Sequence, residues 1–108
     1  MSISEPRKPL FIPLRSWAFS LFYCGTKNIE YRAYGPRWNE KTCTPGRPVT
    51  LSNGYRKERR LSATIKEFST LPGHLAPEAV RLIYRNNMPE TVACIRLQNI
   101  AVIKPKEG

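Results

Sequence analysis

The sequence predicts an α+β fold, a small mixed β-barrel with flanking helices. The chain has 108 residues, which is enough for one hydrophobic core and too few for two. Ten prolines and a hydrophobic fraction of 41% are typical of a loop-rich chain that contains strands. The periodic segments follow the order strand, helix, strand, then a strand pair, then helix and strand. That order favours a small barrel over a doubly wound sheet.

A strand and a helix are expected first. Residues 10–14 are an apolar run, and Pro13 places this strand at an edge or marks its end. The helix follows, because apolar side chains recur at i, i+3, i+4, i+7 and i+8. Gly25 ends this helix, since glycine takes the left-handed conformation without steric cost. The apolar stripe of the helix comprises Leu14, Trp17, Ala18, Leu21 and Phe22.

A charged strand is expected over residues 28–32. Ile29 and Tyr31 alternate with Glu30 and Arg32, so one face is apolar and the other carries opposite charges. We expect the apolar face in the barrel core and the charged face in a cleft. The long irregular segment that follows, residues 34–48, is of a length that is usually functional or disordered.

A hairpin is expected in the middle of the chain. Residues 48–53 have strand character, and the Asn-Gly pair at its end is a strong turn signal. Residues 61–65 carry apolar side chains at alternate positions and predict the partner strand. The basic residues between them then lie at the hairpin tip or at the start of the second strand.

A second helix and a further strand complete the fold. Pro77 suits the first turn of the helix. The nearly continuous apolar run 91–97 predicts a central strand, which residues 100–103 continue or pair with. The inward face of the helix is expected to carry Ala79, Val80, Ile83 and Tyr84.

These segments predict a single domain over residues 10–103. Residues 1–9 form a flexible N-terminal lead-in and residues 104–108 a polar tail. No signal peptide is visible, and the longest apolar stretch, residues 17–24, is too short to span a bilayer. We therefore expect a soluble, cytoplasmic protein with no membrane partner.

The charge balance predicts a polyanionic partner. Lys and Arg number 18 against eight acidic residues, all of them Glu, which gives a net charge of +10. Cations near phosphates release condensed counterions, so a chain this basic attracts nucleic acid. The alternative is that the charge only maintains solubility. Clustering of the cations favours the functional interpretation.

The sequence predicts neither a metal site nor a cofactor. The chain lacks Asp and has a single histidine, His74, which we interpret as structural. These facts exclude a Ser-His-Asp triad and argue against a two-metal nuclease. The three cysteines form no C-x-x-C pair, which indicates a reducing compartment. Cys24 and Cys94 are expected to be buried, and Cys43, in a Pro/Gly loop, to be exposed.

The hairpin tip is the first candidate binding segment. Four cations within five residues predict a phosphate clamp, and the tyrosine beside them predicts a platform for base stacking. Ser52 and Asn53 either point polar groups into the same cleft or cap the turn. Trp38 either stacks on a base or packs on the barrel. The clamp and its platform are Arg56, Lys57, Arg59, Arg60 and Tyr55.

Lys27 and Glu30 are the second candidate site. Lys27 would hold a phosphate or a polarised carbonyl, and Glu30 would act as a base or accept a hydrogen bond from a nucleobase. Arg32 is expected in the same cleft, on phosphate or on Glu30. The alternative is a solvated salt bridge that contributes little to stability.

These segments resemble the ASCH domain, a family of the PUA-like superfamily. The family has a short strand and a helix that lead into a G-x-K-x-x-E-x-R stretch, and then a Gly-bearing loop, a strand and a second polar or basic turn. The resemblance spans residues 10–97. Its elements here are residues 10–12, the helix through Trp17 and Phe22, the stretch Gly25, Lys27, Glu30 and Arg32, then Gly46, residues 48–52 and the turn 52–55.

The resemblance implies a β-barrel with flanking helices and a cleft where Lys27 and Glu30 meet. It also implies RNA binding, and in some members ribonuclease activity. One branch of the family removes the acetyl group from N4-acetylcytidine nucleosides with a lysine, a threonine and a glutamate. Lys27 matches that lysine, but Glu30 stands where the threonine would be.

The leading hypothesis is binding of RNA, or another single-stranded nucleic acid, by a basic cleft. One alternative is a metal-independent ribonuclease or amidohydrolase in which Lys27 and Glu30 are catalytic. Another is an interaction protein of phage or mobile-element origin that docks an acidic partner protein. If the leading hypothesis holds, Lys27, Glu30, Arg32 and the turn 52–55 should open onto one concave surface.

Overall fold

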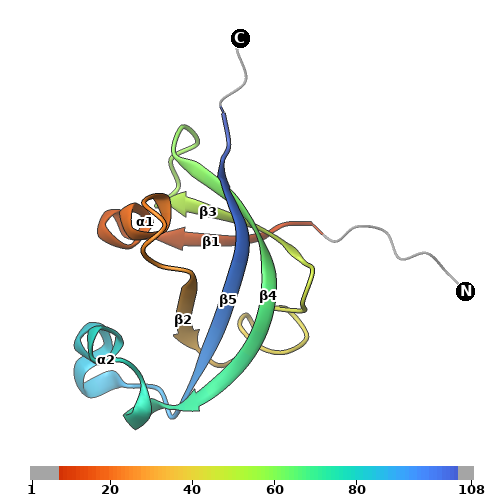
Figure 1. The fold of residues 1–108 in the computed structure, drawn as a ribbon. Coiled ribbons are helices and arrows are strands. Elements are labelled where there is room, and N and C mark those ends of the chain that lie inside the picture. The colour runs from red at the N-terminus through yellow and green to blue at the C-terminus, as the bar shows by residue number, and fades with distance from the viewer. Residues whose placement is uncertain (1–7, 105–108) are drawn as a thin grey trace, which may run out of the picture.

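A computed structural model describes residues 8–104. Its centre is one mixed five-stranded sheet, curled into a half-barrel, in the strand order β1-β3-β4-β5-β2 (Figure 1). The strands are β1 (Leu10–Leu14), β2 (Ile29–Ala33), β3 (Pro48–Asn53), β4 (Arg60–Pro72) and β5 (Thr91–Val102). The helices are α1 (Ser16–Tyr23) and α2 (Glu78–Tyr84), with 3-10 turns η1 (Gly73–Leu75) and η2 (Arg85–Asn87).

The predicted α+β class is confirmed, and so is the order of the elements. β1 pairs with β3 in parallel, and the other three pairs are antiparallel. β5 lies inside the sheet between β4 and β2, as its apolar run predicts. β1 and β2 are the two edge strands, so the barrel is a half-barrel whose open side lies between these two strands.

The main core fills the inner face of the half-barrel. Alternate residues of β1, β3, β4 and β5 point into it, which is the period of two expected for strands with one buried face. Burial of each large apolar side chain contributes roughly 1.5–3 kcal/mol, so this cluster dominates stability. Its fully buried members include Phe22, Ile12, Leu51, Leu61, Ile65 and Ile95.

A second, smaller cluster lies on the other face of β5, under α2. It contains Val80, Val92 and Cys94, with Ile29 and Tyr31 of β2 packed against it. The prediction that Ile29 and Tyr31 lie in the barrel core is therefore wrong. The β2–β5 register explains this, because it pairs Glu30 with Ile95 and Tyr31 with Cys94. Glu30 thus shares the main-core face, and the apolar face of β2 is half-buried under α2.

The helices bury only part of the faces predicted for them. In α1 the buried residues are Ala18, Phe19 and Phe22, whereas Trp17 and Leu21 are 46% and 37% exposed. In α2 only Val80 is buried among residues 78–84. Each helix carries more apolar residues than its packing face needs, so periodicity predicted too wide a stripe in both helices and omitted Phe19 in α1.

The long segment between β2 and β3 is packed onto the core. Cys43 is fully buried and Trp38 nearly so, because Asn39 organises the segment. The Asn39 side chain donates to the carbonyls of Gly35 and Pro36 and accepts from two backbone N–H groups. Cys43 was expected to be exposed and is buried, whereas Cys24 was expected to be buried and is exposed, so both predictions are wrong. Cys94 is buried as expected.

The predicted termini are only partly described. Residues 1–7 of the predicted lead-in and residues 105–108 of the predicted tail lie outside the described residues. Within residues 8–104, no helix has the length and apolar character needed to cross a membrane.

Candidate functional site

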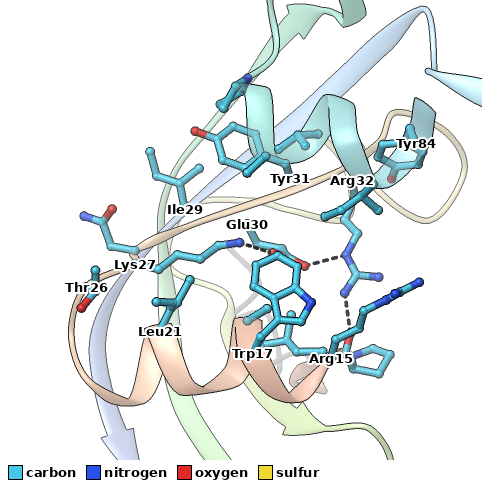
Figure 2. Close-up of a pocket in the computed structure, with 18 residues that line it drawn as sticks. Arg15, Trp17, Leu21, Thr26, Lys27, Ile29, Glu30, Tyr31, Arg32 and Tyr84 are labelled. Atoms are coloured by element: carbon cyan, nitrogen blue, oxygen red, sulfur yellow. Dashed lines mark hydrogen bonds and ion pairs between the residues drawn. The ribbon is translucent and has the colours of Figure 1, made fainter. Parts of the chain in front are cut away.

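A cavity of about 530 Å³ opens between the end of β1, α1, β2 and α2 (Figure 2). Its walls are mainly apolar, and most of its polar groups lie on residues 26–32, in β2 and just before it. It therefore differs from the basic cleft that the sequence predicts. The aromatic and aliphatic walls include Trp17, Leu21, Ile29, Tyr31, Ile83 and Tyr84, and the charged lining residues are Arg15, Lys27, Glu30 and Arg32.

The C-terminus of α1 positions Lys27 at the cavity. Gly25 has φ +77°, and its N–H donates to the Phe22 carbonyl at 3.1 Å. The Thr26 N–H donates to the Leu21 carbonyl at 2.9 Å. These two bonds form a Schellman motif, which reverses the chain sharply at a left-handed glycine. The predicted helix stop at Gly25 is confirmed, and the turn delivers Lys27 directly to the start of β2.

Glu30 is the centre of a charged cluster on the cavity wall. The residue is 5% exposed, and each carboxylate oxygen has its own cation. Lys27 Nζ lies 3.3 Å from Oε1, and Arg32 Nε donates to Oε2 at 2.8 Å. Figure 2 shows Lys27, just before β2, and Arg32, on β2, on either side of the Glu30 carboxylate. A carboxylate this buried requires such pairing, because desolvation of an unpaired charge is costly.

Three aromatic rings surround the Lys27 ammonium group. Nζ lies 5.9 Å from the Trp17 ring centroid, 5.3 Å from Phe22 and 6.0 Å from Tyr31. The negative faces of aromatic rings attract cations at this range. Lys27 is therefore held by both the carboxylate and the rings, and 22% of its side chain stays exposed.

Arg32 joins the two edges of the half-barrel. Its guanidinium donates to Glu30 on β2 and to the Pro13 carbonyl on β1, with an NH2-to-oxygen distance of 2.5 Å. Charge-assisted hydrogen bonds of this kind are stronger than neutral ones. One side chain thus bridges the open side of the barrel, and both Arg32 and Pro13 line the cavity.

Trp38 is not available for stacking on a base. It is 8% exposed, and the guanidinium carbons of Arg32 and Arg37 each lie 4.9 Å from its ring. Of the two roles left open by the sequence, packing on the barrel is correct. The assignment of Trp38 to nucleic-acid binding is therefore wrong.

The turn after β3 lies outside the cavity. No residue from 52–60 is among those that line it. Ser52 is fully buried, and its hydroxyl donates to the Arg56 carbonyl at 3.3 Å. Asn53 accepts a hydrogen bond from the Ser16 hydroxyl at 3.0 Å, which ties the turn to α1. The predicted single concave surface is wrong, and Ser52 and Asn53 serve the turn.

The remaining residues of the predicted clamp lie on the surface beside β1. Tyr55 is 76% exposed and stacks on Phe11 with 5.8 Å between ring centroids. Lys57 and Arg59 are exposed. Arg56 pairs with Glu58, with Nε and Oε1 3.0 Å apart, so part of its charge is already neutralised. The half-buried Arg60 has its guanidinium carbon 5.3 Å from the Phe11 ring.

Two ionisable groups near the site have shifted pKa values. Burial raises the pKa of the Tyr31 phenol, so it is a neutral hydrogen-bonding group on the cavity wall at pH 7. Burial likewise raises the pKa of the Cys94 thiol behind it. Among residues 8–104, no group of three or more His, Cys, Asp or Glu side chains is placed to hold a metal ion.

Sequence reasoning missed much of the cavity wall. Trp17, Leu21 and Ile83 were interpreted as core, yet they are partly exposed and line the cavity with Arg15 and Tyr84. One feature of the sequence could have indicated this wall. In α1 six of the eight residues are hydrophobic, which is more than a one-sided surface helix needs.

Comparison with protein-family models gives no match, and comparison with curated proteins gives none either. Comparison with solved structures matches two mutants of ZmASCH from Zymomonas mobilis. The first has a TM-score of 0.67 at 14% identity over 94% of this chain and 75% of that chain. The second has a TM-score of 0.65 at 15% identity over 94% and 76%. This chain has the fold of an ASCH domain.

The match confirms the fold that the sequence resemblance implies. In this ASCH fold, the G-x-K-x-x-E-x-R stretch runs from the end of α1 into β2 and supplies the charged cluster of the cavity. At 14–15% sequence identity the similarity supports the fold alone, so the chemistry of the cavity has to be argued from its own residues.

Proposed function

We propose that this protein binds single-stranded RNA and takes one unpaired nucleobase into the cavity. The observation that carries this proposal is the Lys27–Glu30–Arg32 cluster on the wall of an aromatic-lined cavity, in a chain of net charge +10. Single-stranded RNA offers unstacked bases with free hydrogen-bonding edges, together with phosphates for the cations.

The size and walls of the cavity support a single base. A volume of about 530 Å³ is in the usual range for small-molecule sites and is too small for a duplex. Trp17 and Tyr31 contribute aromatic rings to its walls, as Figure 2 shows, and Ile83 of α2 is a further lining residue. Aromatic rings in such positions stack on bases with little regard to sequence.

Phosphate contact is supported by Arg15 at the cavity margin. Arg15 is exposed, and its side chain has no ion pair or hydrogen bond with any other residue in the described part of the chain. Lys27 and Arg32 are already engaged by Glu30. Arg15 is therefore the lining cation best able to bind a phosphate without breaking an existing contact.

The pairing of Glu30 favours a binding role over a catalytic one. Each of its two oxygens is held by a cation, so neither is free to contact a reacting group unless an existing ion pair breaks. Lys27 keeps 22% of its side chain exposed, which is the one observation that favours a second candidate, a ribonuclease or amidohydrolase acting through Lys27 and Glu30.

Neighbouring residues on α2 provide a matched test by fluorescence anisotropy. Ile83 lines the cavity, whereas Leu82 is 63% exposed and does not. Ile83→Glu and Leu82→Glu change the net charge equally, so we expect only Ile83→Glu to lower affinity for an unstructured RNA strongly. Trp17→Ala should cost roughly 1–3 kcal/mol of binding free energy by loss of stacking.

The controls separate the alternatives. A DNA strand of the same sequence and an RNA duplex should bind more weakly than the RNA strand. The RNA is recovered afterwards, with chelator present throughout, and cleavage by the wild type but not by Glu30→Gln would favour the enzyme. Undetectable binding of the wild type at low salt, or equal effects of Ile83→Glu and Leu82→Glu, would refute the proposed function.

A further inference from the structure

We propose that Phe11, Tyr55 and Arg60, hereafter the Tyr55 platform, form a second subsite that stacks a nucleotide flanking the base in the cavity. This inference rests on the proposed function and extends it from one nucleotide to a short strand. The platform shares no residue with the lining of the cavity. Its ligand class is a single-stranded nucleic acid of at least a few nucleotides.

The platform is a built surface, although Tyr55 is 76% exposed. The Tyr55 ring stacks on Phe11 at an interplanar angle of 25°. The turn beneath is anchored, since the Gly54 N–H donates to the Leu14 carbonyl at 2.8 Å. Gly54 has φ +64°, a conformation that glycine takes without strain. An exposed ring held in this way loses little freedom when a base stacks on it.

Positive charge surrounds the platform. The Arg60 guanidinium lies against Phe11, and its buried Nε has no hydrogen-bond partner among the described residues. A buried donor without an acceptor lowers the stability of the fold. Lys57 and Arg59 are exposed on the same turn. A phosphate beside a base stacked on Tyr55 would be within the positive field of these three cations, and the exposed Lys57 and Arg59 are free to reach it.

The platform is adjacent to the cavity along β1. Phe11 and Pro13 are two residues apart on one face of the strand, a step of roughly 7 Å. Pro13 lines the cavity, and so does Leu14, which holds the turn through its carbonyl. An RNA strand that leaves the cavity past Pro13 would therefore meet the Tyr55 ring next.

The aromatic component distinguishes nucleic acid from an acidic protein as the partner. An acidic protein surface would need the cations alone, whereas Tyr55 and Phe11 offer a flat ring face that bases use. A charged hairpin tip with no partner would not need a stacked tyrosine either. The combination of ring and cation favours a base with its phosphate.

Tyr23 provides a matched control. It is 61% exposed, its ring contacts Phe19 at 6.5 Å, and it does not line the cavity. Tyr55→Ala should weaken binding of a labelled eight-nucleotide RNA about five-fold or more. Tyr55→Phe should retain the affinity, because it keeps the ring, and Tyr23→Ala should change nothing. Binding of a single nucleotide monophosphate should be the same in all four proteins.

The outcomes distinguish this inference from the function beneath it. If the wild type binds RNA and Tyr55→Ala binds it equally well, the Tyr55 platform is refuted and the cavity proposal stands. If the wild type binds no RNA, both are refuted. Binding of poly-glutamate that depends on Arg59, with no effect of Tyr55→Ala on RNA, would assign the turn to an acidic protein instead. Circular dichroism melts confirm that every variant is folded.

Discussion

At the scale of single residues, Glu30 marks the face of β2 that turns toward the main core. Alternation along the strand correctly separated an apolar face from a charged one. Which face turns toward the core depends on the pairing of Glu30 with Ile95, a contact between residues 65 positions apart that no local pattern contains. The result is a buried carboxylate that draws Lys27 and Arg32 together.

A second residue pair gives a prediction of pH dependence. The Tyr34 hydroxyl donates to Glu40 Oε2 at 2.5 Å, and this bond lowers the pKa of Glu40 from its ordinary value of 4.5. The same bond raises the pKa of Tyr34. Because Glu40 is more acidic when folded than when unfolded, its stabilising contribution is present above pH 4.5 and is lost as the pH falls through its folded pKa.

Tyr34→Phe tests this pair. We expect the pKa of Glu40, measured by NMR titration of its side-chain carboxyl, to rise toward its ordinary value of 4.5 in the variant, because the largest cause of its lowering is removed. The difference in the free energy of unfolding between the wild type and Tyr34→Phe should shrink as the pH falls below the folded pKa of Glu40, because Glu40 is then protonated in both proteins. An unchanged Glu40 titration in Tyr34→Phe would show that the bond is not formed in solution.

At the scale of elements, the sequence predicted the strands well and the helix faces poorly. β3 and the alternation of Leu61, Ala63 and Ile65 on β4 were read correctly, because each strand has one face in the main core. Trp17 and Ile83 were assigned to the core, since the cavity to which they belong exists only where α1 and α2 meet the edge of the curled sheet. That arrangement rests on long-range contacts, so local periodicity does not encode it.

The Schellman motif at the end of α1 gives the prediction at this scale. Gly25→Ala should lower the free energy of unfolding by roughly 1–2 kcal/mol, because alanine is strained at φ +77°. Gly35→Ala is the control, since Gly35 has no left-handed φ and no atom lies within 4 Å of the place that an added methyl group would take. Urea denaturation of both variants measures the difference. Equal stabilities would contradict the role assigned to Gly25.

At the scale of the whole molecule, a half-barrel explains why the cavity exists. The sheet leaves β1 and β2 as unpaired edges, and Arg32 bridges them through the Pro13 carbonyl instead of a backbone ladder. The space that a closed barrel would fill with strand pairing is available for a ligand. Under the proposed function, we expect the +10 charge of the chain to favour a polyanion as that ligand.

The two tryptophans make this account directly testable. Trp17 lines the cavity and is 46% exposed, whereas Trp38 is buried behind Arg32 and Arg37. Each indole N–H gives its own signal in a proton–nitrogen correlation spectrum, and substitution of either residue assigns the pair. The chain thus carries one reporter in the cavity and one internal control.

The decisive measurement is a titration of the labelled protein with a short unstructured RNA, followed through these two signals. Our account predicts that the Trp17 indole signal shifts in a saturable manner, together with the backbone signals of Lys27 and Glu30, while the Trp38 signal stays in place. Saturable binding that leaves Trp17 unmoved and shifts only residues 54–60 would contradict it, because the cavity would then not be the site that takes the base.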